Sequence, residues 1–156
     1  MKKVIVLILI TFFTLKTYSQ VFEKHNVTIS CACSLQNIVN TNDGVNDVAA
    51  YQCVTNNDFI DMYRLTTITF KNQITDFNTY IESLKDEYSL QGTVKETTLG
   101  GKRAVQVKED IIVQGIKLTQ YSVATLHKNQ SITIVYVTNR KENLKLESYK
   151  RSITLN

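Results

Sequence analysis

Proline and tryptophan are absent from the 156 residues of this chain, and glycine occurs only five times. Without proline there is no proline-rich spacer, and no serine-rich stretch, internal repeat or low-complexity segment divides the chain either. The rest of the composition is that of an ordinary globular protein, with 43% hydrophobic and 21% charged residues. We therefore expect one domain with one hydrophobic core.

A strong excess of either charge is also lacking. The chain has 18 basic and 14 acidic side chains, but Lys2, Lys3 and Lys16 lie within the first 19 residues. The remainder therefore carries a net charge of about +1, which is too small to neutralise a run of phosphates. We expect no nucleic acid among the partners of this protein.

The first 19 residues have the three parts of a secretory signal peptide. Lys2 and Lys3 precede an apolar segment of about 12 residues, and small and polar residues follow up to Ser19. A membrane-spanning helix needs about 20 apolar residues, so this segment is too short to serve as one. We expect cleavage after Ser19, a mature domain of residues 20–156 without a stable membrane anchor, and a periplasmic or extracellular location.

One uncharged apolar stretch organises the mature chain. Residues 131–137 are β-branched or aromatic in six of seven positions and lie between polar segments, which predicts a central strand covered on both faces. Helices should then cover both sides of the sheet. Residues 75–90 have helical spacing of apolar residues, with Asp76 near the start, and residues 139–152 begin with a capping-box-like Asn139 and Glu142.

The remaining segments read as strands and turns. Period-two alternation predicts strands at residues 27–35, 48–55, 59–70, 93–99, 103–113 and 116–127, with a loop at residues 37–46. Tight hairpins are expected at Gly100, Gly101 and Gly115. The predicted fold is of the α+β class, with a mostly antiparallel sheet covered by helices on both faces, an α/β/α sandwich.

Five stretches carry a resemblance to a known family, namely residues 22–30, 75–84, 99–107, 131–138 and 147–155. In their apolar residues, glycines and order, the chain resembles small exported bacterial members of the PsbP-like superfamily, which shares its fold with the Mog-type Ran-binding proteins. The resemblance implies the same sandwich fold and a role as an accessory or assembly factor of a protein complex. It brings no shared catalytic residues with it.

Three cysteines are the most distinctive candidates for a site. Cys31 and Cys33 fall on one face of a predicted strand, and Cys53 lies on what should be a neighbouring antiparallel strand. Because export places them in an oxidising environment, we expect a disulfide from Cys53 to either Cys31 or Cys33. The third cysteine would be a buried thiol or an intermolecular partner.

The alternative for these cysteines is a metal or thiol redox site. Cys31, Cys33, Cys53 and His25 together offer the soft ligands that zinc or copper prefers. The Cys-x-Cys spacing differs from the turn-borne Cys-x-x-Cys geometry, and His25 lies six residues from Cys31. We therefore expect no metal, with these four residues as the candidates if one binds.

The other polar residues do not combine into a catalytic motif. His25 and His127 read as solvated or hydrogen-bonded residues, no Gly-x-Ser-x-Gly elbow accompanies a serine, and Gly100-Gly101 lacks the spacing of a phosphate loop. A modestly basic C-terminal segment could dock an acidic partner or lipid headgroups; it contains Arg140, Lys141, Lys145, Lys150 and Arg151. We expect no catalytic residue, no cofactor and no enzymatic activity.

The sequence thus favours an exported, non-catalytic accessory or binding protein that binds a protein partner in the cell envelope. The alternative is a cysteine-dependent metal-binding or thiol redox protein.

Overall fold

The computed structural model describes residues 20–42, 44–141 and 144–156. The expected signal peptide lies in residues 1–19, outside the described residues, and stays a prediction. No helix in the described part of the chain has the length and hydrophobicity needed to span a membrane.

Strands dominate the described chain. In order, the elements are β1 (Gln20–Lys24), β2 (Val27–Cys31), β3 (Gln36–Asn42), β4 (Asn46–Asn56), β5 (Ile60–Phe70), α1 (Phe77–Ser89), β6 (Thr93–Leu99), β7 (Lys102–Val113), β8 (Ile116–His127), β9 (Gln130–Thr138), α2 (Leu144–Arg151) and β10 (Thr154–Leu155).

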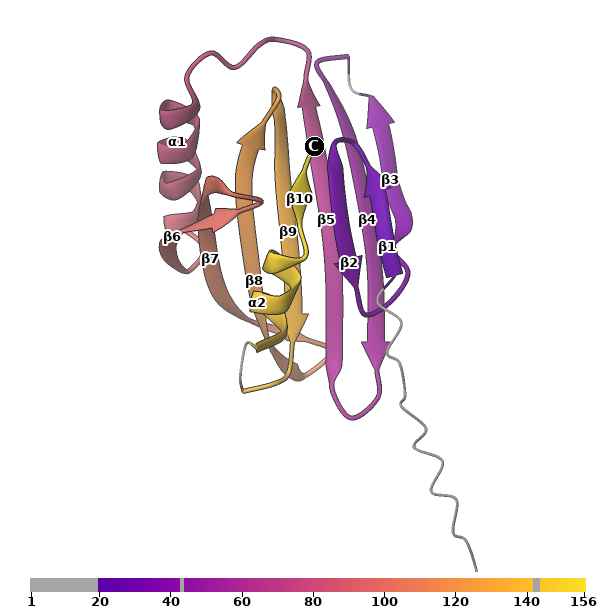
Figure 1. The fold of residues 1–156 in the computed structure, drawn as a ribbon. Coiled ribbons are helices and arrows are strands. Elements are labelled where there is room, and N and C mark those ends of the chain that lie inside the picture. Colours follow the sequence, from indigo (N-terminus) through magenta and orange to yellow (C-terminus); the bar gives the residue numbers. More distant parts are fainter. Residues whose placement is uncertain (1–19, 43, 142–143) are drawn as a thin grey trace, which may run out of the picture.

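Seven of these strands form one antiparallel sheet in the order β3-β4-β5-β9-β8-β7-β6 (Figure 1). β9 is the middle strand, and Ile132, Ile134 and Tyr136 on it have no exposed surface. The central position predicted for residues 131–137 is therefore confirmed. The burial follows from the β-branched and aromatic run, because each fully buried side chain of this size stabilises the fold by about 1.5–3 kcal/mol.

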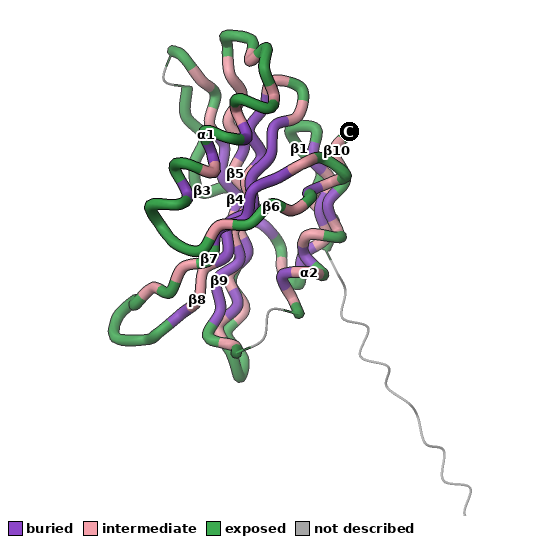
Figure 2. Tube along the Cα trace, turned by 90° about the vertical axis from the view of Figure 1, so that its left-hand side faces the viewer, coloured by how far each residue is buried: buried purple, intermediate pink, exposed green. Residues whose placement is uncertain are grey.

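A second, three-stranded sheet of order β1-β2-β10 covers one face of the large sheet. Val27, Ile29 and Cys31 of β2 belong to the same buried cluster as Tyr63 and other residues of β4, β5, β8 and β9. α2 contributes Leu146 and Tyr149 to this cluster. Figure 2 shows β1, β10 and α2 together on one side of the buried central strands. The main core therefore lies between two sheets.

The strand in the middle of the small sheet joins the two ends of the described chain. β2 pairs with β1 through a two-residue turn and with β10 in the register Thr154↔Thr28. Beyond β10, the backbone amide of Asn156 donates to the carbonyl of Asn26 at 2.9 Å, and its side-chain amide donates to Thr28 Oγ1 at 3.0 Å. The small sheet is thus built from segments far apart in the sequence.

α1 packs on the opposite face of the large sheet, over β6, β7 and β8. Asp76 caps the helix by accepting hydrogen bonds from the amides of Asn78 and Thr79, at 2.9 and 3.0 Å. The helix buries an apolar stripe against the strands beneath it, formed by Ile81, Leu84 and Tyr88 against Val105, Val107 and Ala124. The helix predicted within residues 75–90 is confirmed.

The hairpin turns at glycine are also confirmed. Gly100 and Gly101 link β6 to β7 with φ of +54° and +76°, and Gly115 links β7 to β8 with φ of +81°. Positive φ at both central residues is the requirement of a type I′ turn. A side chain at Gly100 would collide with Leu155, whose Cγ lies 2.4 Å from the position of a Cβ. This hairpin therefore needs glycine both for its conformation and for its contact with β10.

The predicted α/β/α sandwich is wrong. One face of the large sheet is covered mainly by the second sheet, with α2 as a short addition, and on the other face α1 covers only the half formed by β6–β8. The fold is mostly antiparallel β. The prediction failed because a strand with one buried face has the same alternating sequence whether its apolar side chains face a helix or a second sheet.

Three boundaries also differ from the prediction. The strand expected at 27–35 ends at Cys31, and residues 37–46, expected as a loop, contain most of β3. α2 is shorter than the predicted helix, and Asn139 does not cap it, because its Oδ1 accepts a hydrogen bond from the amide of Ile60 at 3.0 Å. The other half of the predicted capping box, Glu142, lies outside the described residues.

Candidate functional site

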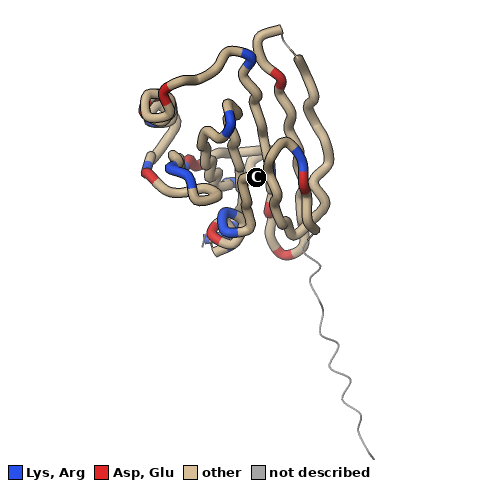
Figure 3. The backbone as a smooth tube through the Cα atoms, turned by 45° about the horizontal axis from the view of Figure 1, so that its top comes forward, with Lys and Arg blue, Asp and Glu red and all other residues tan. Residues whose placement is uncertain are grey.

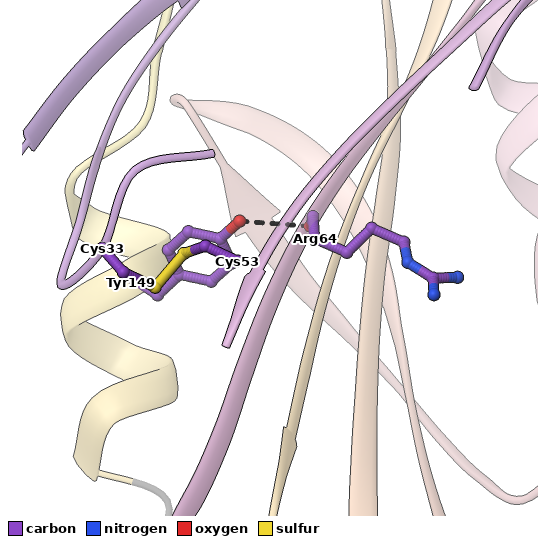
Figure 4. Close-up of a disulfide and its surroundings, with 4 residues drawn as sticks. All are labelled: Cys33, Cys53, Arg64 and Tyr149. Atoms are coloured by element: carbon purple, nitrogen blue, oxygen red, sulfur yellow. Dashed lines mark hydrogen bonds between the residues drawn. A yellow bond between two sulfur atoms is a disulfide. The ribbon is translucent and has the colours of Figure 1, made fainter. Parts of the chain in front are cut away.

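Two of the three cysteines link β4 to the segment that follows β2. Cys33, just after β2, and Cys53, on β4, lie at disulfide distance with their Cα atoms 5.9 Å apart. Figure 4 shows this disulfide beside the ring of Tyr149, whose hydroxyl donates to the carbonyl of Arg64 at 3.1 Å. Of the two pairings expected for Cys53, the structure contains the one with Cys33. Cys53 lies on a strand of the large sheet and Cys33 in the segment that connects β2 to β3, so the two do not come, as expected, from neighbouring strands.

Cys31 remains as a thiol inside the core. It is 3% exposed, and burial raises its pKa to about 11, with a hydrogen bond to Tyr149 opposing the rise only in part. The thiol is therefore protonated at neutral pH, and the thiolate is the form that attacks disulfides and binds metals. Cys31 is packed as a small apolar residue.

His25 does not join the cysteines in a metal site. It lies in the turn between β1 and β2, where its Nε2 is 2.8 Å from the hydroxyl of Tyr51. Among the described residues, no three His, Cys, Asp or Glu side chains come together as metal ligands would. The four candidates named from the sequence, Cys31, Cys33, Cys53 and His25, are thus placed in a disulfide, a buried thiol and a turn.

A buried carboxylate is the centre of a polar cluster. Asp61 on β5 is 1% exposed and accepts hydrogen bonds from Tyr136 at 2.6 Å and Thr138 at 2.8 Å. Lys145 lies 2.7 Å from its second oxygen, and Arg140 contacts both oxygens at 3.1 Å. Sequence reasoning missed this site, although Asp61 occupies an inward position of a strand that alternates buried and half-buried residues.

The pKa of Asp61 follows from these contacts. Burial alone would raise it, but the hydrogen bonds from Arg140, Lys145, Tyr136 and Thr138 together outweigh burial and hold the pKa well below its usual range. The carboxylate is therefore permanently charged at neutral pH. It ties the segment that leads into α2 to the middle of the large sheet.

A hollow of about 620 Å³ lies outside this cluster. Phe59 and Leu144 supply its apolar wall, and the guanidinium of Arg140 stacks over the ring of Phe59 at 4.0 Å. Two of the cations at its rim, Arg140 and Lys145, already bind Asp61, and further along α2 the ammonium of Lys150 donates to Thr97 Oγ1. Much of the basic segment considered as a docking surface is therefore engaged within the protein.

The half of the large sheet that α1 leaves uncovered is a surface open to a partner. Along β5 the inward residues 61, 63, 65 and 67 are buried, while residues 62, 64, 66 and 68 on the other face are half-buried. Neighbouring strands extend this pattern. We call this surface the open sheet face; its residues are Val48, Gln52, Val54, Met62, Arg64, Thr66, Ile68, Thr133 and Val135.

The open sheet face is mostly apolar and has one charge near its middle. Val54 is 51% exposed, and Arg64 is the one charged residue among the nine. The side chain of Gln52 on β4 accepts from Arg64 Nη2 at 2.7 Å and from Nε at 3.0 Å, which holds the guanidinium over the strands. Such a surface offers aliphatic contact and one oriented donor group, the features of a protein-binding patch.

α1 forms the boundary of this face. The hydroxyl of Tyr80 donates to Ser131 Oγ on β9 at 2.6 Å, and the ring of Phe70 contacts Tyr80 edge-on with centroids 6.1 Å apart. Tyr88 is 9% exposed, and a hydrogen bond links its side chain to Thr133. α1 thus borders the open sheet face along β9, where Tyr80 and Tyr88 contact that strand.

Comparisons with known proteins add little to this description. No protein family matches the sequence, and no curated protein matches it. Among solved structures, a protein of unknown function from Pseudomonas aeruginosa, described as a putative regulator, is similar over 83% of this chain and 88% of its own, with 10% identity and a TM-score of 0.43. The resemblance to the PsbP-like superfamily is untested by these comparisons and stays a prediction.

Proposed function

We propose that this chain is an exported, non-catalytic binding protein and that the open sheet face binds a protein partner. The observation that carries the proposal is the contrast between the two faces of β5. One face is buried under the second sheet, whereas the other presents Met62, Thr66 and Ile68 half-buried, and no helix or strand among the described residues packs over them. Aliphatic surface gathered on rigid strands is typical of an interaction site.

The position of Arg64 supports a protein as the partner. Interface centres are enriched in arginine and poor in other charges, and Gln52 holds this guanidinium in place before binding. A carboxylate or main-chain carbonyl of a partner could accept a hydrogen bond from this guanidinium. The bond would cost little further conformational entropy, because Gln52 already orients the donor.

Export draws support from the cysteines. Disulfides persist in oxidising compartments, and the Cys33–Cys53 distance is consistent with such a location. The cysteine-dependent alternative loses support from the same pair, because two of its three thiols are used in the disulfide and the third is a buried thiol with a raised pKa.

The test is a cross-linked native pulldown from envelope and culture fluid of the source organism, using the mature protein and two variants. Val54→Asp with Met62→Asp places two charges on the open sheet face, and Ile112→Asp, at a side chain that is 76% exposed on β7, is the matched control. We expect one partner to be recovered with wild type and with Ile112→Asp, and to be lost with the double variant. Equal recovery with all three proteins, or no reproducible partner, would refute the proposal.

A further inference from the structure

The two sheets end in four edge strands, and three of these are protected. β6 carries Lys95 and Glu96, and Glu96 is held by Lys85 and Arg103. α1 packs along β6 as well. In the small sheet, β1 has five residues that include a Glu and a Lys, and β10 has only two residues. Charge, cover and shortness are the usual means by which proteins prevent pairing at a sheet edge.

The fourth edge, β3, has little of this protection. Its seven residues, Gln-Asn-Ile-Val-Asn-Thr-Asn, contain no charge and no proline, and all seven are exposed. Ile38 and Val39 expose 48% and 37% of their surface. Figure 3 shows the tube along β3, at the right-hand edge of the large sheet, without a charged residue. An uncharged edge strand with apolar side chains is a template for a further strand.

One irregularity limits the part of β3 that can pair. The register with β4 shifts between Asn37 and Val39, and the side-chain amide of Asn37 donates to the carbonyl of Val39 at 3.0 Å across this bulge. From Val39 to Asn42 the register is regular, which leaves a short straight segment centred near Asn40 and Thr41. A new strand would pair with this segment.

We propose that β3 pairs antiparallel with β3 of a second copy of this chain and so forms a twofold-symmetric dimer. A strand can pair with itself around a twofold axis only if it does not repel itself, and β3 has no charge to do so. The nearest cation on a neighbouring element, Lys71, donates to Asn42 Oδ1 at one end of β3. In an antiparallel pair the two Lys71 side chains would lie at opposite ends.

The dimer would join two large sheets into one continuous sheet. Because an antiparallel strand pair has its twofold axis perpendicular to the sheet, both open sheet faces would lie on the same side, with an α1 helix at each far border. The pairing rests on the edge strand alone and does not depend on what the open sheet face binds. It would double the surface available to a partner.

The pair should be weak. A stable protein interface buries about 1,200–2,000 Å², and the edge of one short strand buries less than this. Self-association should therefore depend on concentration, with monomer in dilute solution and dimer in concentrated solution.

The experiment measures mass and amide exchange against concentration. We expect the mass of the mature protein to rise from monomer toward dimer between about 10 μM and 1 mM, a range set by the small area. The amides of β3 should become protected from hydrogen exchange over the same range. Asn40→Lys and Asn40→Glu should each weaken self-association by about 10-fold or more, because the axis brings two like charges together. Thr93→Lys, on the protected edge β6, is the matched control and should leave association unchanged.

A mixture of the two charged variants decides the geometry. Asn40→Lys and Asn40→Glu should pair with each other although neither pairs with itself, which a folding defect in either variant would not produce. If the wild-type protein stays monomeric over this range, and the amides of β3 exchange at the same rate at its lower and upper ends, then β3 does not pair with a second copy and the proposal is wrong. Variants that dimerise as wild type does would place the interface elsewhere and overturn the proposal too.

Discussion

Asp61 shows how one side chain joins distant parts of the chain. It lies on β5, and its donors lie on β9, in the segment after β9 and in α2. The carboxylate has almost no exposed surface, whereas Arg140 and Lys145 reach solvent with 30% and 41% of their side chains. Its charge is therefore compensated from one side by protein groups that still contact water.

Replacing this carboxylate tests its role. In Asp61→Asn the amide cannot neutralise Arg140 and Lys145, so we expect the free energy of unfolding to fall by about 2 kcal/mol. This is less than the 3–5 kcal/mol of a fully buried broken pair, because the two cations reach solvent. Urea unfolding measures the loss. Asp58→Asn, in the exposed turn before β5, is the control and should change stability little. Equal stability of both variants would show that the cluster contributes nothing.

The cluster was beyond sequence reasoning for a physical reason. A lone aspartate inside a strand pattern reads as a solvent-facing position unless its partners are known, and these lie 75 to 84 residues away. The pattern of β5 does show Asp61 in phase with the inward-facing Tyr63 and Leu65. An acidic residue at the same alternate positions as buried apolar residues was therefore the signal in the sequence that could have indicated a buried carboxylate.

Among the elements, those with a one-sided apolar pattern were predictable and those without it were not. β9 and α1 follow from a continuous run and from helical spacing, both local properties. β3 was missed because none of its residues is buried, so no alternation marks it. β2 was predicted as a strand but placed in the wrong sheet, since its partners β1 and β10 are chosen by tertiary packing.

The disulfide is a covalent constraint between β4 and the segment that connects β2 to β3. Closing a loop of 20 residues should stabilise the fold by about 3 kcal/mol in the chain-entropy model. We expect a reducing agent to lower the urea midpoint of wild type and of Cys31→Ala by the same amount. The double variant Cys33→Ala with Cys53→Ala should start at the lower midpoint and not respond. Loss of the response in Cys31→Ala would assign the disulfide to Cys31 instead.

For the whole molecule, several carboxyl groups have a lowered pKa in the folded state. Burial opposes the shift at Asp61, but its hydrogen bonds prevail, and hydrogen bonds from Arg103 and Lys85 lower the pKa of Glu96 to about 2. Glu82 and Asp110 are lowered as well, each with its largest contribution from a side-chain hydrogen bond. The unfolded chain, with carboxyl pKa values near about 4, therefore takes up more protons as pH falls.

The protein should accordingly lose stability in acid. The contribution of these carboxylates is complete above about pH 5 and is lost as pH falls toward 2. Unfolding curves at pH 2 to 7 measure it. High salt should screen the exposed ion pairs of Glu82 and Glu96 and so remove much of their contribution to the free energy of unfolding. The contribution of buried Asp61 should persist at high salt in wild type and be absent in Asp61→Asn. A stability that is constant over this range would contradict the assignment.

The pairing of β2 with both β1 and β10 sets the order in which the molecule can be completed. β1 and β2 are adjacent in the sequence and can form a hairpin by themselves, but the third strand of their sheet, β10, is synthesised only after all the other described strands. The hairpin therefore lacks its third strand until nearly all of the described residues have been synthesised. Completion of the small sheet is consequently a late step in folding.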